Sequence, residues 1–305
     1  MSLKNVNSVL LHLSRQGRRV LSPWRAMLAL ADEVPRHRLK EVAQRTVRQM
    51  LRAGLLQEIP GVKAPLYLVT APYVEHVEVN PYEVLMEASF DGSVAYSSAM
   101  VLHRLTDQRY RTLHLLVPKK AGRAPRPLDT SSLDWEKVED DGMPSPKRLH
   151  RIEGYHVEYH TTKPEWFFGL ESIRPEGFAV TVTDLERTLI DGLRCSKYCG
   201  GLGEVFRAWV RAEGLFDLDR LILYAAKFES SITYQRLGFV LETLGVHDKR
   251  VEAWKHVHAQ RGGSRLLDPE GAYTQEAGAP YFHPEWKLSI NYPVTILETK
   301  DASYS

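Results

Sequence analysis

The stretch that decides the fold of the N-terminal part runs from Arg36 to Val69 and reads RHRLKEVAQRTVRQMLRAGLLQEIPGVKAPLYLV. Its first half repeats apolar side chains every three or four residues, which predicts a helix that buries one face. The inward positions are Leu39, Val42, Ala43, Thr46 and Met50, with Val47 and Leu51 at the flanks. Gly54 is expected to end the helix, because glycine adopts the left-handed backbone of a C-cap. Leu55–Ile59 and Ala64–Val69 then predict two short strands joined by a four-residue turn, which is a β-hairpin.

Two further helices are predicted upstream of this stretch. Apolar residues at helical spacing run from Leu3 to about Gln16, and Gly17 follows them. Ser22-Pro23 is a helix start signal, because serine caps free amides and proline fits the first helical position, so a second helix is expected to run to about Ala31. Three helices followed by a hairpin predict a winged helix-turn-helix domain over residues 1–80, with a boundary near Asn80-Pro81.

The charge of the chain is distributed unevenly. Residues 1–70 contain twelve Lys and Arg against four Asp and Glu, a net charge of +8, while the whole chain carries only +2. A basic head joined to an acidic body favours binding of a polyanion, and several arginines share one ridge of the third helix, where they repel one another. The residues expected to contact DNA are Arg36, Arg38, Lys40, Gln44, Arg45, Arg48, Arg52 and Lys63. A solvated basic face, or a winged helix that binds a protein, remains the alternative.

Composition narrows the class of protein. The chain has 305 residues, 43% of them hydrophobic and 26% charged, which is typical of globular domains. It has no apolar run long enough for a membrane span and no signal-peptide pattern at its start, so we expect no membrane partner. The two cysteines, Cys195 and Cys199, are too few for a disulfide framework, and we expect a cytoplasmic location.

The body, residues 81–305, is expected to be a mixed α/β domain, which makes the chain an α+β protein. We expect a helix from Ser93 to about Leu105, and strands at Leu113–Val117, His156–His160 and Phe178–Val182. Thr183-Asp184 is expected to cap the next helix, with Glu186 in a capping box, and three further helices follow before residue 245. The segment 119–150 is rich in proline and mixed charges and is expected to be a long exposed loop.

The sequence gives weak indications of an enzyme. A zinc site would need the cysteine pair to meet His256 and His258. Asp184, Glu186 and Asp191 could indicate magnesium, but capping explains the first two. A pair with Arg187 or Arg194 explains Asp191. We therefore assign no catalytic, cofactor-binding or metal-binding residue, and expect no cofactor.

Several stretches of the body resemble the AbiEi family of antitoxins. They are SVAYSSAMVLHRLT at residues 93–106, VTDLERTLIDGL at 182–193 followed by Gly200-Gly201, QRLGFVLE at 235–242 and WKLSIN at 286–291. Their order after an expected winged helix carries the resemblance, since none of them is a catalytic signature. The long segment after Lys119 and the aromatic-rich tail depart from the family pattern.

The resemblance implies a bacterial or mobile-element antitoxin, of a kind linked to phage defence, with two partners. Its winged helix would bind inverted repeats in double-stranded operator DNA and repress its own operon. Its C-terminal domain would neutralise a cognate toxin protein of the nucleotidyltransferase type. Two other interpretations stay open: a stand-alone transcriptional regulator whose body senses a small molecule, and a nucleic-acid-modifying enzyme.

Overall fold

The computed structural model describes residues 3–70, 80–119, 126–138, 145–258, 265–271 and 281–298. The protein is α+β, and its chain divides into two compact units. The first unit comprises residues 1–94, 111–164 and 172–182, and the second comprises residues 95–110, 165–171 and 183–305. The first unit therefore contains all of the expected 1–80 domain together with strands that we expected in the 81–305 domain.

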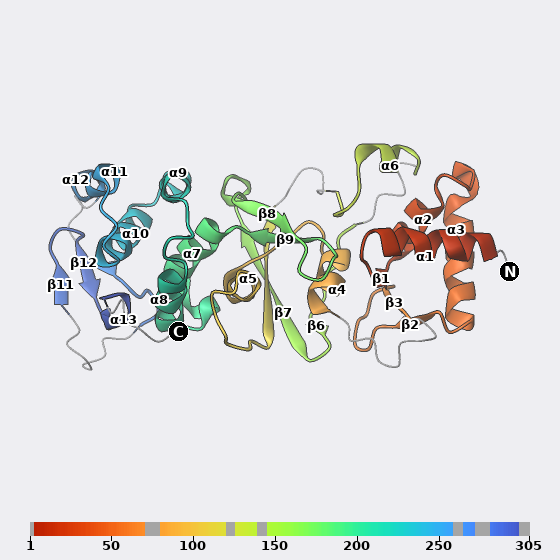
Figure 1. The fold of residues 1–305 in the computed structure, drawn as a ribbon, viewed down its shortest axis with the longest axis horizontal. Coiled ribbons are helices and arrows are strands. Elements are labelled where there is room, and N and C mark those ends of the chain that lie inside the picture. Colours follow the sequence, from red (N-terminus) through yellow and green to blue (C-terminus); the bar gives the residue numbers. More distant parts are fainter. Residues whose placement is uncertain are drawn as a thin grey trace. The chain divides into compact units, whose positions relative to one another are not determined.

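The N-terminal part of the first unit consists of three helices and three short strands, which Figure 1 shows gathered at the N-terminal end of the ribbon. In chain order they are α1 (Leu3–Arg15), β1 (Val20–Leu21), α2 (Pro23–Leu30), α3 (Arg36–Arg52), β2 (Leu56–Glu58) and β3 (Tyr67–Val69). The strands form an antiparallel sheet in the order β1-β3-β2. The helices and the hairpin lie within a few residues of their predicted bounds, whereas β1 was not predicted.

Local signals explain these bounds. The Ser22 hydroxyl accepts a hydrogen bond from the Arg25 amide at 3.2 Å, which caps α2. Gly17 and Gly54 follow α1 and α3 with φ of +64° and +68°, a backbone region that side chains with a Cβ disfavour. The predicted stop signals are therefore confirmed at both helices.

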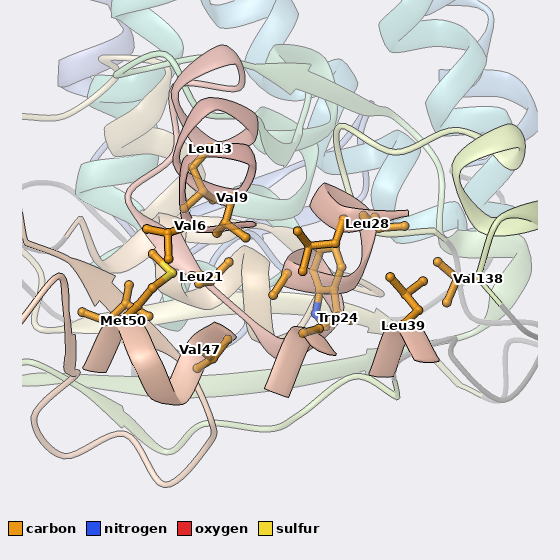
Figure 2. Close-up of a cluster of buried hydrophobic side chains, with 14 of the residues drawn as sticks. Val6, Val9, Leu13, Leu21, Trp24, Leu28, Leu39, Val47, Met50 and Val138 are labelled. Carbon is orange, nitrogen blue, oxygen red and sulfur yellow. The ribbon is translucent and has the colours of Figure 1, made fainter. Parts of the chain in front are cut away.

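The three helices share one hydrophobic core. Figure 2 shows side chains of α1, α2 and α3 pointing toward one another, with Val138 beside Leu39. Met50 and Val9 are completely buried. The spacing that predicted the helices is thus the spacing of their buried faces.

Residues 126–138 differ from the expected loop. They include a short helix, α6 (Ser132–Glu136), which begins with a capping box between Ser131 and Asp134. Trp135 of this helix is 7% exposed and lies 5.9 Å from Trp24 between ring centroids. A local hydrogen-bond signal and one large aromatic therefore fix this part on the N-terminal core. The neighbouring residues 120–125 and 139–144 lie outside the described residues.

The rest of the first unit contains most of a six-stranded sheet in the order β6-β7-β5-β4-β9-β8. Its strands are β4 (Ser93–Val94), β5 (Thr112–Pro118), β6 (Arg151–Ile152), β7 (Tyr155–Thr162), β8 (Leu170–Ile173) and β9 (Val180–Thr183), and α4 (Pro81–Ala88) precedes them. The expected helix from Ser93 was wrong at its start, because Ser93 and Val94 pair with Leu116 and Leu115 as a strand.

The second unit is mainly helical and also contains a small sheet in the order β10-β12-β11. Its helices are α5 (Tyr96–Leu102), α7 (Leu185–Arg194), α8 (Leu202–Arg211), α9 (Leu218–Phe228), α10 (Ser231–Thr243), α11 (Lys249–Glu252), α12 (Trp254–Val257) and α13 (Thr295–Glu298). Two 3-10 turns, η2 (Pro164–Trp166) and η3 (Ser196–Cys199), and the strands β10 (Arg265–Leu266), β11 (Tyr281–His283) and β12 (Leu288–Ile290) accompany them. In the described part of the chain, β12 is followed by the short helix α13.

Candidate nucleic-acid interface

The candidate interface is the outward face of α3. This helix has no glycine or proline inside it and turns Leu39, Ala43, Val47 and Met50 into the core. Val47, expected at a flank, is buried to 4% exposure. Because the inward positions fix the rotation of the helix, the residues between them must face outward.

All eight residues predicted to contact DNA are exposed. We call the seven on α3 the basic ridge: Arg36, Arg38, Lys40, Gln44, Arg45, Arg48 and Arg52. Six basic side chains against one acid give α3 a net charge of +5. The acid, Glu41, pairs with Arg45, but both side chains remain more than half exposed, so the pair adds little stability.

Most of the ridge is not neutralised within the described ranges. There, no carboxylate lies within 4.0 Å of the cationic groups of Arg38, Lys40, Arg48 or Arg52. Arg48 donates a hydrogen bond from Nε to the main-chain oxygen of Gln44 at 3.3 Å. The ridge is therefore a concentrated positive surface that can attract phosphate groups.

Lys63 lies in the turn between β2 and β3. Ile59 and Leu66 are buried on either side of the turn, while Lys63 is exposed, and Gly61 has φ of +76°. The hairpin thus holds one cationic side chain outward at its tip, separate in sequence from the ridge.

Two buried carboxylates of α4, which no local sequence signal marks, anchor residues of the N-terminal part. Glu83 accepts hydrogen bonds from the amides of Arg19 and Val20, both at 2.7 Å. Glu87 accepts from Arg25 Nε at 2.9 Å and from Arg25 Nη2 at 2.7 Å. Glu83 and Glu87 stand four residues apart, a spacing that is equally typical of acids on a solvent-exposed helix face. The sequence alone therefore could not show that they are buried or which residues they bind.

The buried ion pairs correct the charge estimate for the head. Arg18 and Arg25 are only 4% and 1% exposed. Arg18 pairs with Asp129 at 2.9 Å and Arg25 with Glu87 at 2.7 Å. Two of the twelve basic residues are therefore structural, and the surface charge is concentrated on α3 more than the sequence indicated.

A largely apolar cavity of about 250 Å³ lies beside one end of the ridge, within the first unit. Its lining residues include Trp24, Met27 and Phe90, together with the basic residue Lys40 and the acidic residue Glu87. A cavity of this kind can accept a small ligand with an apolar body and an anionic group.

The cysteines and acids singled out in the body have structural roles. Cys195 ends α7 and Cys199 is buried, and burial raises the pKa of both thiols. Among the described residues, the cysteine pair does not meet His256 and His258 in metal-ligand geometry. His258 instead stacks on Tyr234, with ring centroids 3.7 Å apart.

The acids of α7 are similarly explained. Asp184 caps the helix through the Arg187 amide, as predicted. Asp191 pairs with Arg187 at 2.8 Å and lies 3.7 Å from Arg194, as predicted. The capping box was wrong: Glu186 accepts from the Asp217 amide and from Arg220, because the third helical position is Arg187.

The structure also brings together three residues that were not among the predicted site residues. His114 of β5 and Glu158 and His160 of β7 have their side-chain nitrogens and carboxylate within hydrogen-bond or ion-pair distance of one another. Burial and the neighbouring His160 lower the pKa of His114 to about 4, so its ring is neutral at pH 7. The two histidines are 46 residues apart, and no sequence motif joins them.

Comparisons with known proteins identify a solved structure with a similar fold. No protein-family model matches the chain, and no curated protein matches it. The structure is similar to that of the RV2827C protein from Mycobacterium tuberculosis, with a TM-score of 0.54 and 15% identity. The match covers 93% of this chain and 96% of that chain. At this identity the likeness concerns the α+β fold alone. In the described parts of the chain, we find no helix with the length and hydrophobicity of a membrane span.

Proposed function

We propose that the chain is a DNA-binding antitoxin that represses its own operon. The observation that carries the DNA-binding half is the exposed basic ridge of α3, in which Arg38, Lys40, Arg48 and Arg52 have no carboxylate within 4.0 Å among the described residues. In this proposal α1, α2, α3 and the β2–β3 hairpin form a winged helix-turn-helix, with α3 as the recognition helix. The order of elements and the β1-β3-β2 sheet support that assignment.

The spacing of the ridge suits a duplex groove. Arg38, Arg45, Arg48 and Arg52 recur at multiples of about 3.5 residues, so they stay on one side of the helix. With a rise of 1.5 Å per residue they span about 21 Å. A helix fits the major groove, where arginine donates bidentately to guanine and to phosphate. Lys63 would contact the backbone from the hairpin.

The antitoxin half rests on the AbiEi resemblance of the body. In this proposal the C-terminal domain binds and neutralises a toxin of the nucleotidyltransferase type encoded by the adjacent gene. The motif at residues 182–193 covers the end of β9, the N-cap Asp184 and most of α7, and its polar side chains make internal contacts such as Arg187–Asp191. That motif would therefore support the domain, and the toxin would bind the surface around it.

The test of DNA binding is the salt dependence of affinity for a promoter fragment from upstream of the gene. Arg45→Ala combined with Arg48→Ala should weaken binding and lower the slope of log K against log salt by about 0.9 for each phosphate that the variant no longer neutralises. The matched control is Lys4→Ala with Arg15→Ala, which removes the same charge from exposed positions on α1. Equal slopes for both double variants would show that α3 acts only through net charge.

The test of the antitoxin half is co-expression with the adjacent open reading frame. Growth rescue and co-purification are expected with the full chain. A chain truncated before residue 183 could lose activity simply because the first unit does not fold alone. Co-purification is therefore measured with the full chain and with full-length surface variants. Failure to rescue growth, with DNA binding intact, would leave a stand-alone regulator.

The cavity beside Lys40 favours that second candidate, a regulator that senses a small molecule. An anionic ligand bound there would draw Lys40 away from DNA and compete with operator binding. Met27→Trp should fill the cavity and remove any ligand response while the ridge stays intact. A ligand that shifts operator affinity equally in this variant would place sensing elsewhere.

A further inference from the structure

The strand register places three potential metal ligands on one face of the large sheet. β5 and β7 are parallel, with His114 opposite Glu158 and Leu116 opposite His160. Side chains alternate between the two faces of a sheet, so Glu158 and His160, two residues apart, lie on one face. His114 is on that same face because it stands directly opposite Glu158.

The donor atoms of these residues form a compact triangle. His114 Nδ1 lies 2.9 Å from His160 Nε2 and 3.6 Å from Glu158 Oε2, and His160 Nε2 lies 3.9 Å from the same oxygen. Ligands bound to Zn²⁺ at about 2.0–2.1 Å in a tetrahedron are separated from one another by about 3.3 Å. The observed separations fall on both sides of that value, so shifts of a few tenths of an ångström would seat an ion.

The surroundings of the triangle suit an open metal site. His114 is 6% exposed and the His160 side chain is 13% exposed, so the two rings are held by packing on adjacent strands. The Glu158 side chain is 54% exposed, which leaves one side of the triangle open to water. Two imidazoles and one carboxylate, with an open position for water, are a ligand set found in zinc enzymes.

We propose that His114 Nδ1, His160 Nε2 and Glu158 Oε2 bind a divalent transition metal ion, with Zn²⁺ as the ion of choice. Imidazole ligands favour Zn²⁺ over Mg²⁺, which prefers oxygen ligands and retains its water. The ion would replace the direct contact between the two rings and join β5 to β7. This site is independent of the DNA-binding ridge and holds whether or not the proposed function does.

The experiment is a titration of the full-length chain, freed of any purification tag and treated with EDTA, with Zn²⁺ followed by calorimetry. One equivalent is expected to bind. His160→Ala and Glu158→Gln should each weaken binding by more than about tenfold. Loss of a residue that only orients a metal ligand already costs about 10–100-fold in affinity, and loss of a ligand should cost at least as much. His156→Ala is the matched control, since His156 is exposed and lies on the same strand two residues before Glu158.

A second readout separates ligation from loose surface binding. Co²⁺ in place of Zn²⁺ should give visible d–d absorption bands, which His160→Ala removes and His156→Ala preserves. Should His160→Ala misfold by circular dichroism, Glu158→Gln still decides the matter, because Glu158 is exposed. Absence of saturable Zn²⁺ binding, or one-equivalent binding kept by both ligand variants, would overturn the proposal and leave the histidines as a hydrogen-bonded pair.

Discussion

Replacement of Glu87 by alanine should destabilise the first unit strongly. The Glu87 side chain is fully buried and accepts from both Nε and Nη2 of Arg25, from the Ser22 hydroxyl at 2.6 Å, and from Arg18 at 3.4 Å. Without it Arg25 would keep Gln16 as a hydrogen-bond partner at 2.6 Å but would lose its counterion. Burial already lowers the pKa of Arg25, which shows how poorly this site solvates a lone cation.

The magnitude follows from the loss of one partner of a buried pair, which costs about 3–5 kcal/mol of unfolding free energy. The first unit has 159 residues, and in that size range 1 kcal/mol shifts the melting temperature by about 2–4 °C. Glu87→Ala should therefore lower the melting transition of this unit by about 6–20 °C. Arg25→Met combined with Glu87→Met should lose less than the two single variants added together, because the double variant leaves no lone charge.

The assay is thermal unfolding of five proteins, namely the wild type, Glu87→Ala, Glu87→Met, Arg25→Met and the double methionine variant. Unfolding is followed by far-ultraviolet circular dichroism at one pH and one salt concentration. The difference between the double variant and the sum of the single variants gives the coupling energy of the pair. A loss below about 1 kcal/mol for Glu87→Ala, or additive losses in the cycle, would refute the reasoning that this pair is buried and coupled.

Three further predictions concern packing and protonation. Trp135→Ala should cost about 3–5 kcal/mol of unfolding free energy, whereas Leu133→Ala, exposed on the same helix, should stay within about 0.5 kcal/mol in chemical denaturation. Gly238→Ala should cost about 1–3 kcal/mol in the same measurement, since its Cβ would lie 2.1 Å from the Trp286 ring. Burial lowers the pKa of His12 below 6.5, so the unfolded chain binds the extra proton and stability should fall as pH drops below 6.5; His12→Leu should flatten that slope.

Much of the N-terminal part could be predicted because its signals are local. Ser22-Pro23, Gly17 and Gly54 each act within a few residues, and each begins or ends a helix as expected. The apolar spacing of α3 predicted both its buried face and the exposure of Arg45 and its neighbours on the ridge. Periodicity fixes the rotation of a helix without any knowledge of what packs against it.

What the sequence could not supply are contacts between distant segments. Arg18 was counted with the surface charge, but its partner Asp129 is 111 residues away. His114 meets His160 through the register of two parallel strands, which no local pattern specifies. Trp135 looked like part of a polar segment, because one aromatic does not make a periodic pattern. Each error concerns a residue whose environment is set by chain that is remote in sequence.

The contrast between the two groups of arginines strengthens the proposal for α3. Arg18 and Arg25 are buried and each forms an ion pair with a carboxylate inside the first unit. On α3, Arg45, Arg48 and Arg52 stand three and four residues apart, which costs about 0.2–0.5 kcal/mol for each neighbouring pair. The first turn also carries cations and no acid, opposite to the preference of the helix dipole. Recognition helices place their N-terminal residues in the groove, so phosphate and base contacts at Arg36 and Arg38 would offset the unfavourable dipole interaction of the first turn.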